Sequence, residues 1–479
     1  MLLGNNKLNQ PTHMKHDALT THAAVFGSTG SGKTGLLLGM VEELYDSNVP
    51  VILVDIKGDM LNVALNDERL HVRCLTPGAT HGEAVNVLSD LEDPEKASTV
   101  ISALLSMIGE DPDPLTSTAH VFLTEVLNDL EKPTLTNLVW GCQSPRFSSL
   151  GALSLDEAFP KRARSKLLRK MNTLLVSPSF KAWRIGMDLE LDEVVADGGI
   201  TIYSVAHLTD ADEQSFAVSF LLNEVLRWTR QQPGSSELRL VLAIDECVGL
   251  LPPHPANPPT KRPIMLLLKQ ARAFGVGLIL ATQNPVDIDY KAMSNCNTWF
   301  VGRMTAQRDR DRVVAGMVTA GLGNDEKLHD DIASLKSREF IVNQSGRNGV
   351  ETFKSRNVAC QLPGPMIPSD VEEMYDNEYL SYPNYDATLS AERARVALRG
   401  PIEKEDSISV KDVPAYNLVV EDYEDLENYF QTPEPDYYDE LPTDLNVVNS
   451  AIGLGLLGAY AYGLMQVFEV TATFLKGVL

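Results

Sequence analysis

The sequence predicts an α/β fold built on a mostly parallel sheet. Apolar stretches of strand length, such as 238–246 and 276–284, alternate with amphipathic stretches of helical spacing, such as 215–231. This alternation is typical of parallel strands connected and covered by helices. A chain of 479 residues, 44% of them hydrophobic, can bury the large core that such a fold requires.

The charge balance limits the partners of the chain. There are 65 acidic residues against 41 Lys and Arg, for a net charge of −24. The molecule as a whole therefore cannot act as a polycation, and contact with nucleic acid requires a local basic surface. Its five cysteines share no CxxC spacing, so the sequence predicts neither a zinc site nor a disulfide framework. The N-terminus lacks the pattern of a signal peptide, and we expect a cytoplasmic protein.

The first predicted elements are a strand at 23–27, a glycine-rich turn and a helix from Thr34 to Tyr45. The turn, GSTGSGKT, has the pattern G-x-x-x-x-G-K-T in the strand-to-helix setting that a phosphate loop needs. Backbone N–H groups and the helix N-terminus would bind phosphate oxygens, Lys33 would reach the β- and γ-phosphates, and Thr34 would ligate Mg²⁺. A purely structural turn would explain neither the Lys-Thr pair nor the flanking elements. The predicted ATP-binding residues are Gly27, Ser28, Thr29, Gly30, Ser31, Gly32, Lys33 and Thr34.

A second strand follows at 51–54, and residues 94–188 then carry helical spacing, which predicts a helical insertion between two parts of the sheet. The insertion contains KRARSKLLRK, residues 161–170, with six basic residues and no acid. On a helix, Arg162, Lys166, Arg169 and Lys170 fall largely along one side. They could follow DNA phosphates without reading bases, or they could form a solvated face, and both interpretations stay open.

The strand pattern resumes at 199–208, and the apolar stretch 238–246 ends in Asp245 and Glu246. We predict that Asp245 holds Mg²⁺ and that Glu246 activates the attacking water. The strand at 199–208, between the two motifs, favours the P-loop subdivision with an inserted central strand. Gln283 ends the next apolar strand, where it would sense the γ-phosphate. Arg272 ends the preceding helix, where it would complement the helix dipole or complete the site of a neighbouring subunit.

The composition changes beyond Gln361, where Pro and acidic residues become frequent. Residues 421–440 hold nine carboxylates and no Lys or Arg, which predicts an extended linker. The uncharged stretch 451–468 is long enough to contact or just span a membrane, or it is a helix docked on protein. The predicted segments are a first part of the ATPase core, a helical insertion, a second part of the core, an acidic linker and an apolar C-terminal helix: 1–93, 94–190, 191–361, 362–446 and 447–479.

The ordered set GSTGSGKT, VDIKGD, LAIDE, KQARAFGVGLILATQNP and SNCNTWFVGR resembles the HerA branch of the HerA/FtsK family of ring-shaped DNA-translocating ATPases, over residues 17 to about 345. The resemblance implies a RecA-like core, a hexamer with ATP between subunits, and duplex DNA in a central channel. It also implies that Gln283 is the sensor and that Arg272 lies where related conjugation ATPases place a trans-acting arginine. Asp55, Lys57 and Asp59 match a family motif at a strand end. Family members usually begin with a small β-barrel, whereas here about twenty residues precede the first predicted strand.

These observations predict an ATP-hydrolysing DNA translocase that uses ATP and Mg²⁺, with Lys33, Glu246, Gln283 and Arg272 as catalytic residues and Thr34 and Asp245 at the metal. Two alternatives stay open. One is a membrane-anchored DNA-pumping or packaging ATPase. The other is a nucleotide-gated scaffold for a partner nuclease or defence effector.

Overall fold

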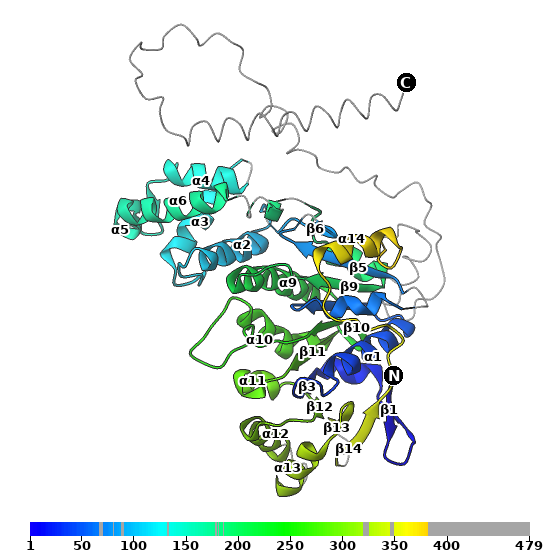
Figure 1. The fold of residues 1–479 in the computed structure, drawn as a ribbon. Coiled ribbons are helices and arrows are strands. Elements are labelled where there is room, and N and C mark those ends of the chain that lie inside the picture. Colours follow the sequence, from blue (N-terminus) through cyan, green and yellow to red (C-terminus); the bar gives the residue numbers. More distant parts are fainter. Residues whose placement is uncertain are drawn as a thin grey trace, which may run out of the picture. The chain divides into compact units, whose positions relative to one another are not determined.

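The computed structural model describes residues 1–381 except 67–69, 80, 88–90, 132–133, 178–179, 181, 185, 320–324 and 345–348. In this part of the chain, twelve strands form one sheet (Figure 1). From one edge to the other they are β2 (Pro11–His13), β1 (Leu2–Asn6), β14 (Glu351–Ser355), β13 (Glu339–Gln344), β12 (Thr298–Gly302), β3 (Ala23–Phe26), β11 (Phe274–Thr282), β10 (Ser235–Ile244), β4 (Val51–Asp55), β9 (Ile200–Ser204), β5 (Val72–Pro77) and β6 (Glu83–Val85).

The eight strands from β12 to β6 are parallel, and the four at the other edge pair antiparallel. The predicted α/β fold with a mostly parallel sheet is therefore confirmed. β11 lies between β3 and β10, so this strand separates the phosphate-loop strand from the strand that precedes Asp245. The inserted central strand is thus β11 rather than the strand expected at 199–208, because β9 lies on the far side of β4.

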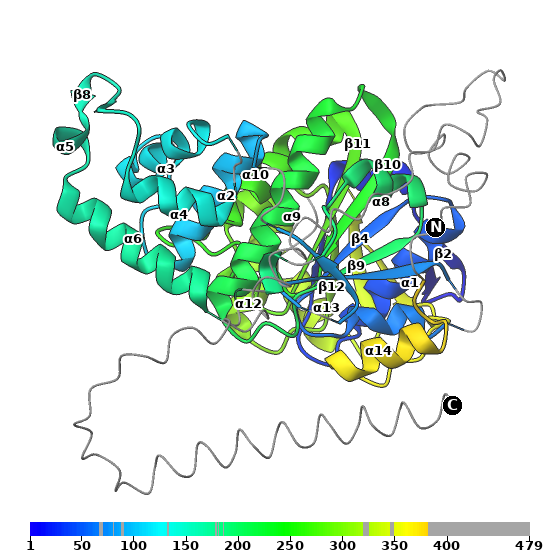
Figure 2. The same ribbon diagram turned by 90° about the horizontal axis from the view of Figure 1, so that it is seen from above.

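Both faces of the parallel strands are buried, which explains their continuous apolar runs. In β4, Val51 and Leu53 join one hydrophobic cluster, while Ile52 and Val54 join the cluster on the opposite face. Figure 2 shows the sheet between these two layers. The first is covered by α1 (Lys33–Asp46), η2 (Met60–Ala64) and α14 (Pro368–Asp376), and the second by α2 (Pro94–Met107), α9 (Ala211–Gln231), α10 (Lys261–Gln270), α12 (Gln307–Thr319) and α13 (Asp325–Ser334).

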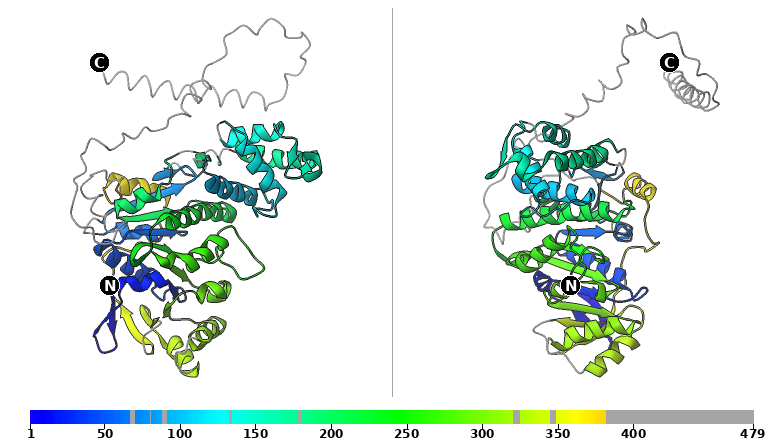
Figure 3. Two further views of the ribbon diagram at one scale, coloured as in Figure 1. Left: turned by 180° about the vertical axis from the view of Figure 1, so that it is seen from behind. Right: turned by 90° about the vertical axis from the view of Figure 1, so that its left-hand side faces the viewer.

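The region predicted to be helical consists mainly of α-helices, together with the two-stranded pair β7–β8. α2 packs on α9, α3 packs on α2, and α4 contacts both α3 and α6, which form the cyan group in Figures 1 and 3. Asp93 caps α2 by accepting hydrogen bonds from two backbone N–H groups of its first turn. The elements are α3 (Thr118–Asn128), α4 (Leu135–Gln143), β7 (Ser149–Leu150), β8 (Leu153–Ser154), α5 (Leu155–Ala158), α6 (Lys161–Val176), η3 (Ala182–Arg184) and α8 (Leu191–Asp197).

Several elements were not predicted from the sequence. The first strand is β1 rather than the strand at 23–27, because the N-terminal residues fold into a hairpin that extends the sheet edge through β14. The first residues of the predicted linker also fold, since Val371 and Met374 of α14 are buried in the core. Within the described part of the chain, none of the helices is both long and apolar enough to cross a bilayer. The stretch 451–468 lies outside the described residues.

Candidate nucleotide site

The phosphate loop connects the end of β3 to the N-terminus of α1. Gly30 and Gly32 have φ values of 75° and 96°, in the left-handed region that side chains disfavour. Gly32 precedes α1 without a side-chain cap, so the first N–H groups of this 14-residue helix are oriented toward the loop. Such a helix start combines free donors with the positive end of the dipole. The local backbone is therefore suited to an anion.

Lys33 is buried and donates from Nζ to the carbonyl oxygen of Gly27 at 2.7 Å. Burial lowers the pKa of Lys33, while the carboxylates of Asp245 and Glu246 act in the opposite direction. The ammonium group thus lies inside the phosphate loop. A bound phosphate oxygen would replace the Gly27 carbonyl oxygen as its hydrogen-bond partner.

Contacts from the loops after β12 and α13 hold the phosphate loop. The Ser28 N–H donates to Arg303 O at 2.9 Å, and the Arg338 N–H donates to Ser31 O at 2.7 Å. Ser337 Oγ donates to Gly30 O at 3.0 Å. Since these partners come from the neighbouring part of the sheet, the loop conformation depends on the folded core as well as on its own glycines.

The acidic pair follows β10, two strands away from β3. Asp245 is buried, and its pKa is raised by that burial, against the opposing effect of the Lys33 and Lys57 ammonium groups. Glu246 has a φ of 59°, which is uncommon for a residue with a side chain and is typical of constrained functional sites. Its Oε2 lies 2.9 Å from Lys57 Nζ, and its Oε1 accepts from the Gln283 N–H at 3.3 Å.

Gln283 links the two halves of the site. It follows β11, the strand between β3 and β10, and its Oε1 accepts a hydrogen bond from Thr29 Oγ1 at 2.6 Å. Its backbone N–H bonds Glu246, so one residue contacts both the phosphate loop and the acidic pair. The structure therefore brings Lys33, Thr29, Glu246 and Gln283 together at the carboxyl ends of adjacent parallel strands, where ligands of open α/β sheets bind.

The loop after β4 contributes Lys57, for which the sequence predicted no role, and Asp55 orders this loop. Asp55 Oδ1 accepts the Gly58 N–H at 2.7 Å, and Oδ2 accepts the Met60 N–H at 3.2 Å. Burial raises the pKa of Asp55 to about 7, although these hydrogen bonds oppose the shift. The ordered loop directs Lys57 to Glu246. In the sequence, Lys57 was part of a family motif at a strand end, without a role, and its contact with Glu246 depends on β4 lying next to β10.

Arg272 lies apart from this cluster within the same chain. It belongs to η4 (Ala271–Ala273), at the amino end of β11, whereas Gln283 follows the carboxyl end. The nine residues of β11 separate them by roughly 30 Å at the rise of an extended strand. Arg272 is exposed there. The geometry excludes contact with the phosphate loop of its own chain, and any contribution to nucleotide hydrolysis would be made to another subunit.

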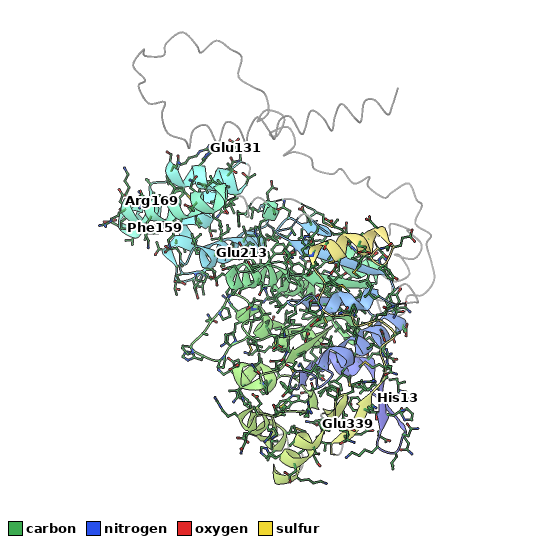
Figure 4. All side chains as sticks on the ribbon, viewed as in Figure 1. His13, Glu131, Phe159, Arg169, Glu213 and Glu339 are labelled. Atoms are coloured by element: carbon green, nitrogen blue, oxygen red, sulfur yellow. The ribbon has the colours of Figure 1, made fainter. Side chains whose placement is uncertain are left out.

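The basic run on α6 has two kinds of residue. Lys166 and Lys170 lie 3.5 and 2.6 Å from Glu110 Oε1, so they pair within the insertion instead of presenting free charges. Arg162 and Arg169, seven positions apart on the helix, are exposed, and Arg169 points outward in Figure 4. The predicted one-sided basic stripe is therefore reduced by its ion pairs.

The residues present fit a nucleotide with Mg²⁺. Thr34 and Asp245 offer the oxygen ligands that Mg²⁺ prefers, beside the loop that would hold phosphates. Among the described residues, no group of three or more His, Cys, Asp or Glu side chains forms a metal site. A magnesium ion would therefore take its remaining ligands from phosphate oxygens and water, as is usual for this ion.

The twelve-stranded sheet and the glycine-rich loop at the end of β3 define a RecA-like P-loop protein. Residues 6–225 match the family model described as "Helicase HerA, central domain". The chain therefore carries a HerA-type central domain and is similar to the HerA/FtsK superfamily of P-loop ATPases.

Two curated relatives are distant in sequence. The chain is 20% identical over 358 residues to the probable helicase MJ1565 of Methanocaldococcus jannaschii, covering 71% of this chain and 64% of the relative. It is 21% identical over 336 residues to the DNA double-strand break repair helicase HerA of Sulfurisphaera tokodaii, covering 68% of this chain and 63% of the relative. The chain thus spans less than two thirds of the length of these relatives.

Two solved structures share the fold. VirB4 of Thermoanaerobacter pseudethanolicus matches with a TM-score of 0.55 at 15% identity, over 74% of this chain and 96% of that chain. The plasmid coupling protein TrwB in complex with ADP and Mg²⁺ matches with a TM-score of 0.52 at 16% identity, over 76% of this chain and 92% of that chain.

Proposed function

We propose that the protein is an ATP-hydrolysing DNA translocase that acts on duplex DNA as a ring-shaped homo-oligomer, a hexamer by its resemblance to the HerA branch. The observation that carries the hydrolytic part is the hydrogen-bonded set from Thr29 through Gln283 to Glu246, next to the buried Lys33. This set combines a phosphate-binding backbone with a carboxylate that can accept a proton. The name of the Sulfurisphaera tokodaii relative supports DNA as the substrate on which the energy is used.

In the proposed reaction, the backbone of the phosphate loop and Lys33 bind the β- and γ-phosphates. A water molecule attacks the γ-phosphorus, its oxygen forming the new P–O bond while the bond to the β–γ bridging oxygen breaks. Glu246 accepts the proton of that water, and ADP leaves with the electron pair of the broken bond. Gln283 senses the γ-phosphate through its contact with the loop. Bound Mg²⁺, held by Thr34 and Asp245, would neutralise phosphate charge.

The decisive experiment is steady-state ATP hydrolysis by the full chain, with and without linear duplex DNA, across a salt series. We expect strong stimulation by DNA that fades as salt rises, because contacts limited to phosphates release counterions. A rate that DNA does not change would overturn the translocase and favour a nucleotide-gated scaffold for a partner enzyme. Parallel fractionation of the full chain and of a chain lacking residues 447–479 tests the membrane-anchored alternative.

A further inference from the structure

The ion pair between Lys57 and Glu246 joins the loop after β4 to the acidic pair after β10. β4 and β10 are parallel neighbours, with Val54 opposite Ile244, so both loops leave the sheet at the same edge. Lys57 Nζ lies 2.9 Å from Glu246 Oε2. This contact involves the carboxylate to which the proposed function assigns the attacking water.

Both oxygens of that carboxylate have partners. Oε1 accepts hydrogen bonds from the Gln283 N–H at 3.3 Å and from Thr282 Oγ1 at 3.4 Å, both anchored to β11. Oε2 is held by the Lys57 ammonium. A carboxylate that accepts a proton from water needs a free oxygen in hydrogen-bond reach of that water. Of the two oxygens, Oε2 is the one that can be released without moving the backbone of the sheet.

The loop that carries Lys57 is fixed, whereas the lysine side chain is not. Gly58 has a φ of 86°, and a Cβ at that position would lie 2.7 Å from Met366 O. The Met366 N–H also donates to Gly58 O at 3.1 Å, and Asp55 accepts the Gly58 N–H. The Lys57 side chain is 40% exposed, against 14% for Glu246. The ammonium group can therefore swing on its flexible stem while its backbone stays in place.

Lys57 also lies close to the phosphate-binding region. Its ammonium group contributes to lowering the pKa of Lys33 and opposes the rise in the pKa of Asp245. A γ-phosphate bound near Lys33 carries more negative charge than a single carboxylate. It would therefore compete with Glu246 for the Lys57 ammonium.

We propose that Lys57 is a positioning residue that holds Glu246 through Oε2 and moves to the γ-phosphate when a nucleoside triphosphate binds, so that the carboxylate is released toward the attacking water. This inference rests on the proposed function and deepens it, because the release of Glu246 then requires a triphosphate in the site. ADP lacks the group that attracts the lysine and leaves the ion pair closed.

The first test compares the dissociation constants of ADP and of a non-hydrolysable ATP analogue, each with Mg²⁺, by calorimetry. Lys57→Met is expected to weaken binding of the ATP analogue about tenfold and to change the dissociation constant of ADP by no more than about twofold. A tenfold loss of affinity corresponds to about one charge-assisted hydrogen bond. Lys57→Arg is expected to keep most of the preference. Lys7→Met, at an exposed lysine in the turn between β1 and β2, is the matched control and should change neither constant. Equal weakening of both nucleotides, or no change, would overturn the proposal.

A double-mutant cycle tests whether Lys57 is held by Glu246 before the nucleotide binds or is only a ligand of the phosphate. Glu246→Gln removes the competing anion, so it should tighten binding of the ATP analogue about threefold or more when Lys57 is present. The same change in a Lys57→Met background should have no such effect. Tightening of the same size in both backgrounds would contradict the proposal. Failure of the unchanged protein to bind either nucleotide would overturn the proposed function, and this inference with it.

Discussion

Buried charged side chains mark the candidate site at the scale of single residues. Lys33 and Asp245 are both nearly enclosed, and each makes the charged form of the other less costly. A buried charge is expensive unless it is paired or functional. The two residues are more than two hundred positions apart in the chain, so the fold brings them close enough to interact.

Substitutions of Glu246 and of Lys33 should affect nucleotide binding and ATP hydrolysis differently. Glu246→Gln keeps the shape of the side chain but cannot accept a proton, so we expect it to bind ATP with hydrolysis reduced by a factor of at least about 10². Lys33→Ala should lose nucleotide binding or turnover. Hydrolysis and equilibrium binding measured on the same preparations check both. Full hydrolysis by the Glu246→Gln protein would contradict the assignment of the base.

A buried histidine predicts a pH dependence of stability. Burial lowers the pKa of His22 to about 4, and its Nδ1 accepts the Leu278 N–H. Since the folded pKa lies below the unfolded value, the full stability is present above pH 6.5 and is lost as the pH falls toward 4, by roughly 3 kcal/mol. His22 has a φ of 64°, which Asn tolerates.

His22→Asn should therefore flatten the decline of the unfolding free energy between pH 6.5 and 4, as measured by denaturant titration at several pH values. The exposed His13, changed in the same way, serves as the control and should leave the slope as it was. An unaltered slope in the His22→Asn protein would show that the acid sensitivity arises elsewhere.

The loop after β4 shows how a single element depends on a distant segment. The chain between Arg356 and α14 passes beside this loop, where Asn62 Nδ2 donates to Gly364 O at 3.1 Å and the Met366 N–H donates to Gly58 O. Gly58 needs its left-handed backbone at this point because Met366 leaves no room for a Cβ. The position of Lys57 is therefore set partly by residues about three hundred positions later.

Gly58→Ala should destabilise the protein by about 1–3 kcal/mol, through backbone strain and the clash with Met366. Gly39→Ala, inside α1, meets only ordinary contacts at 3.7 Å or more and should be neutral or stabilising by up to about 1 kcal/mol. Thermal unfolding of the two variants gives the comparison. Similar midpoints for both would argue against the close approach of Met366.

The helix α6 carries two exposed arginines, Arg162 and Arg169, and two lysines that pair with Glu110. If Arg162 and Arg169 contact DNA phosphates, replacing both with Ala should reduce the slope of log K against log salt by about 2 and weaken binding without regard to sequence. Lys170→Ala breaks a pair with Glu110 and should leave that slope unchanged. Duplex binding at several salt concentrations measures both. Equal slopes in all three proteins would show that α6 is a solvated face.

The whole molecule raises the question of how Arg272 could act. It lies at the opposite end of β11 from Gln283, so a role in hydrolysis requires a second subunit. Arg272→Ala should reduce hydrolysis by about 10³-fold or more if it acts on the neighbour's nucleotide. Mixing it with Glu246→Gln subunits should restore part of the activity, because some interfaces then carry both intact groups. No recovery at any ratio would contradict a trans role.

The sequence by itself determined the fold class and the residues of the two motifs. Continuous apolar runs such as Val51–Val54 predict strands buried on both faces, and GSTGSGKT predicts its own turn, because these signals are local. Gln283 was also found from its position at a strand end. Local patterns did not predict β1, β2 or α14, since short strands near a sheet edge and a short helix gain most of their stability from packing on the finished sheet.

Only the tertiary structure decided which residues meet. The placement of β11 between β3 and β10 brings Gln283 between Thr29 and Glu246, and the pairing of β4 with β10 brings Lys57 to Glu246. The structure also separated Arg272 from the phosphate loop and paired Lys166 and Lys170 with Glu110. Strand order and long-range contacts arise from the packing of the complete core, and no stretch of sequence read alone contains them.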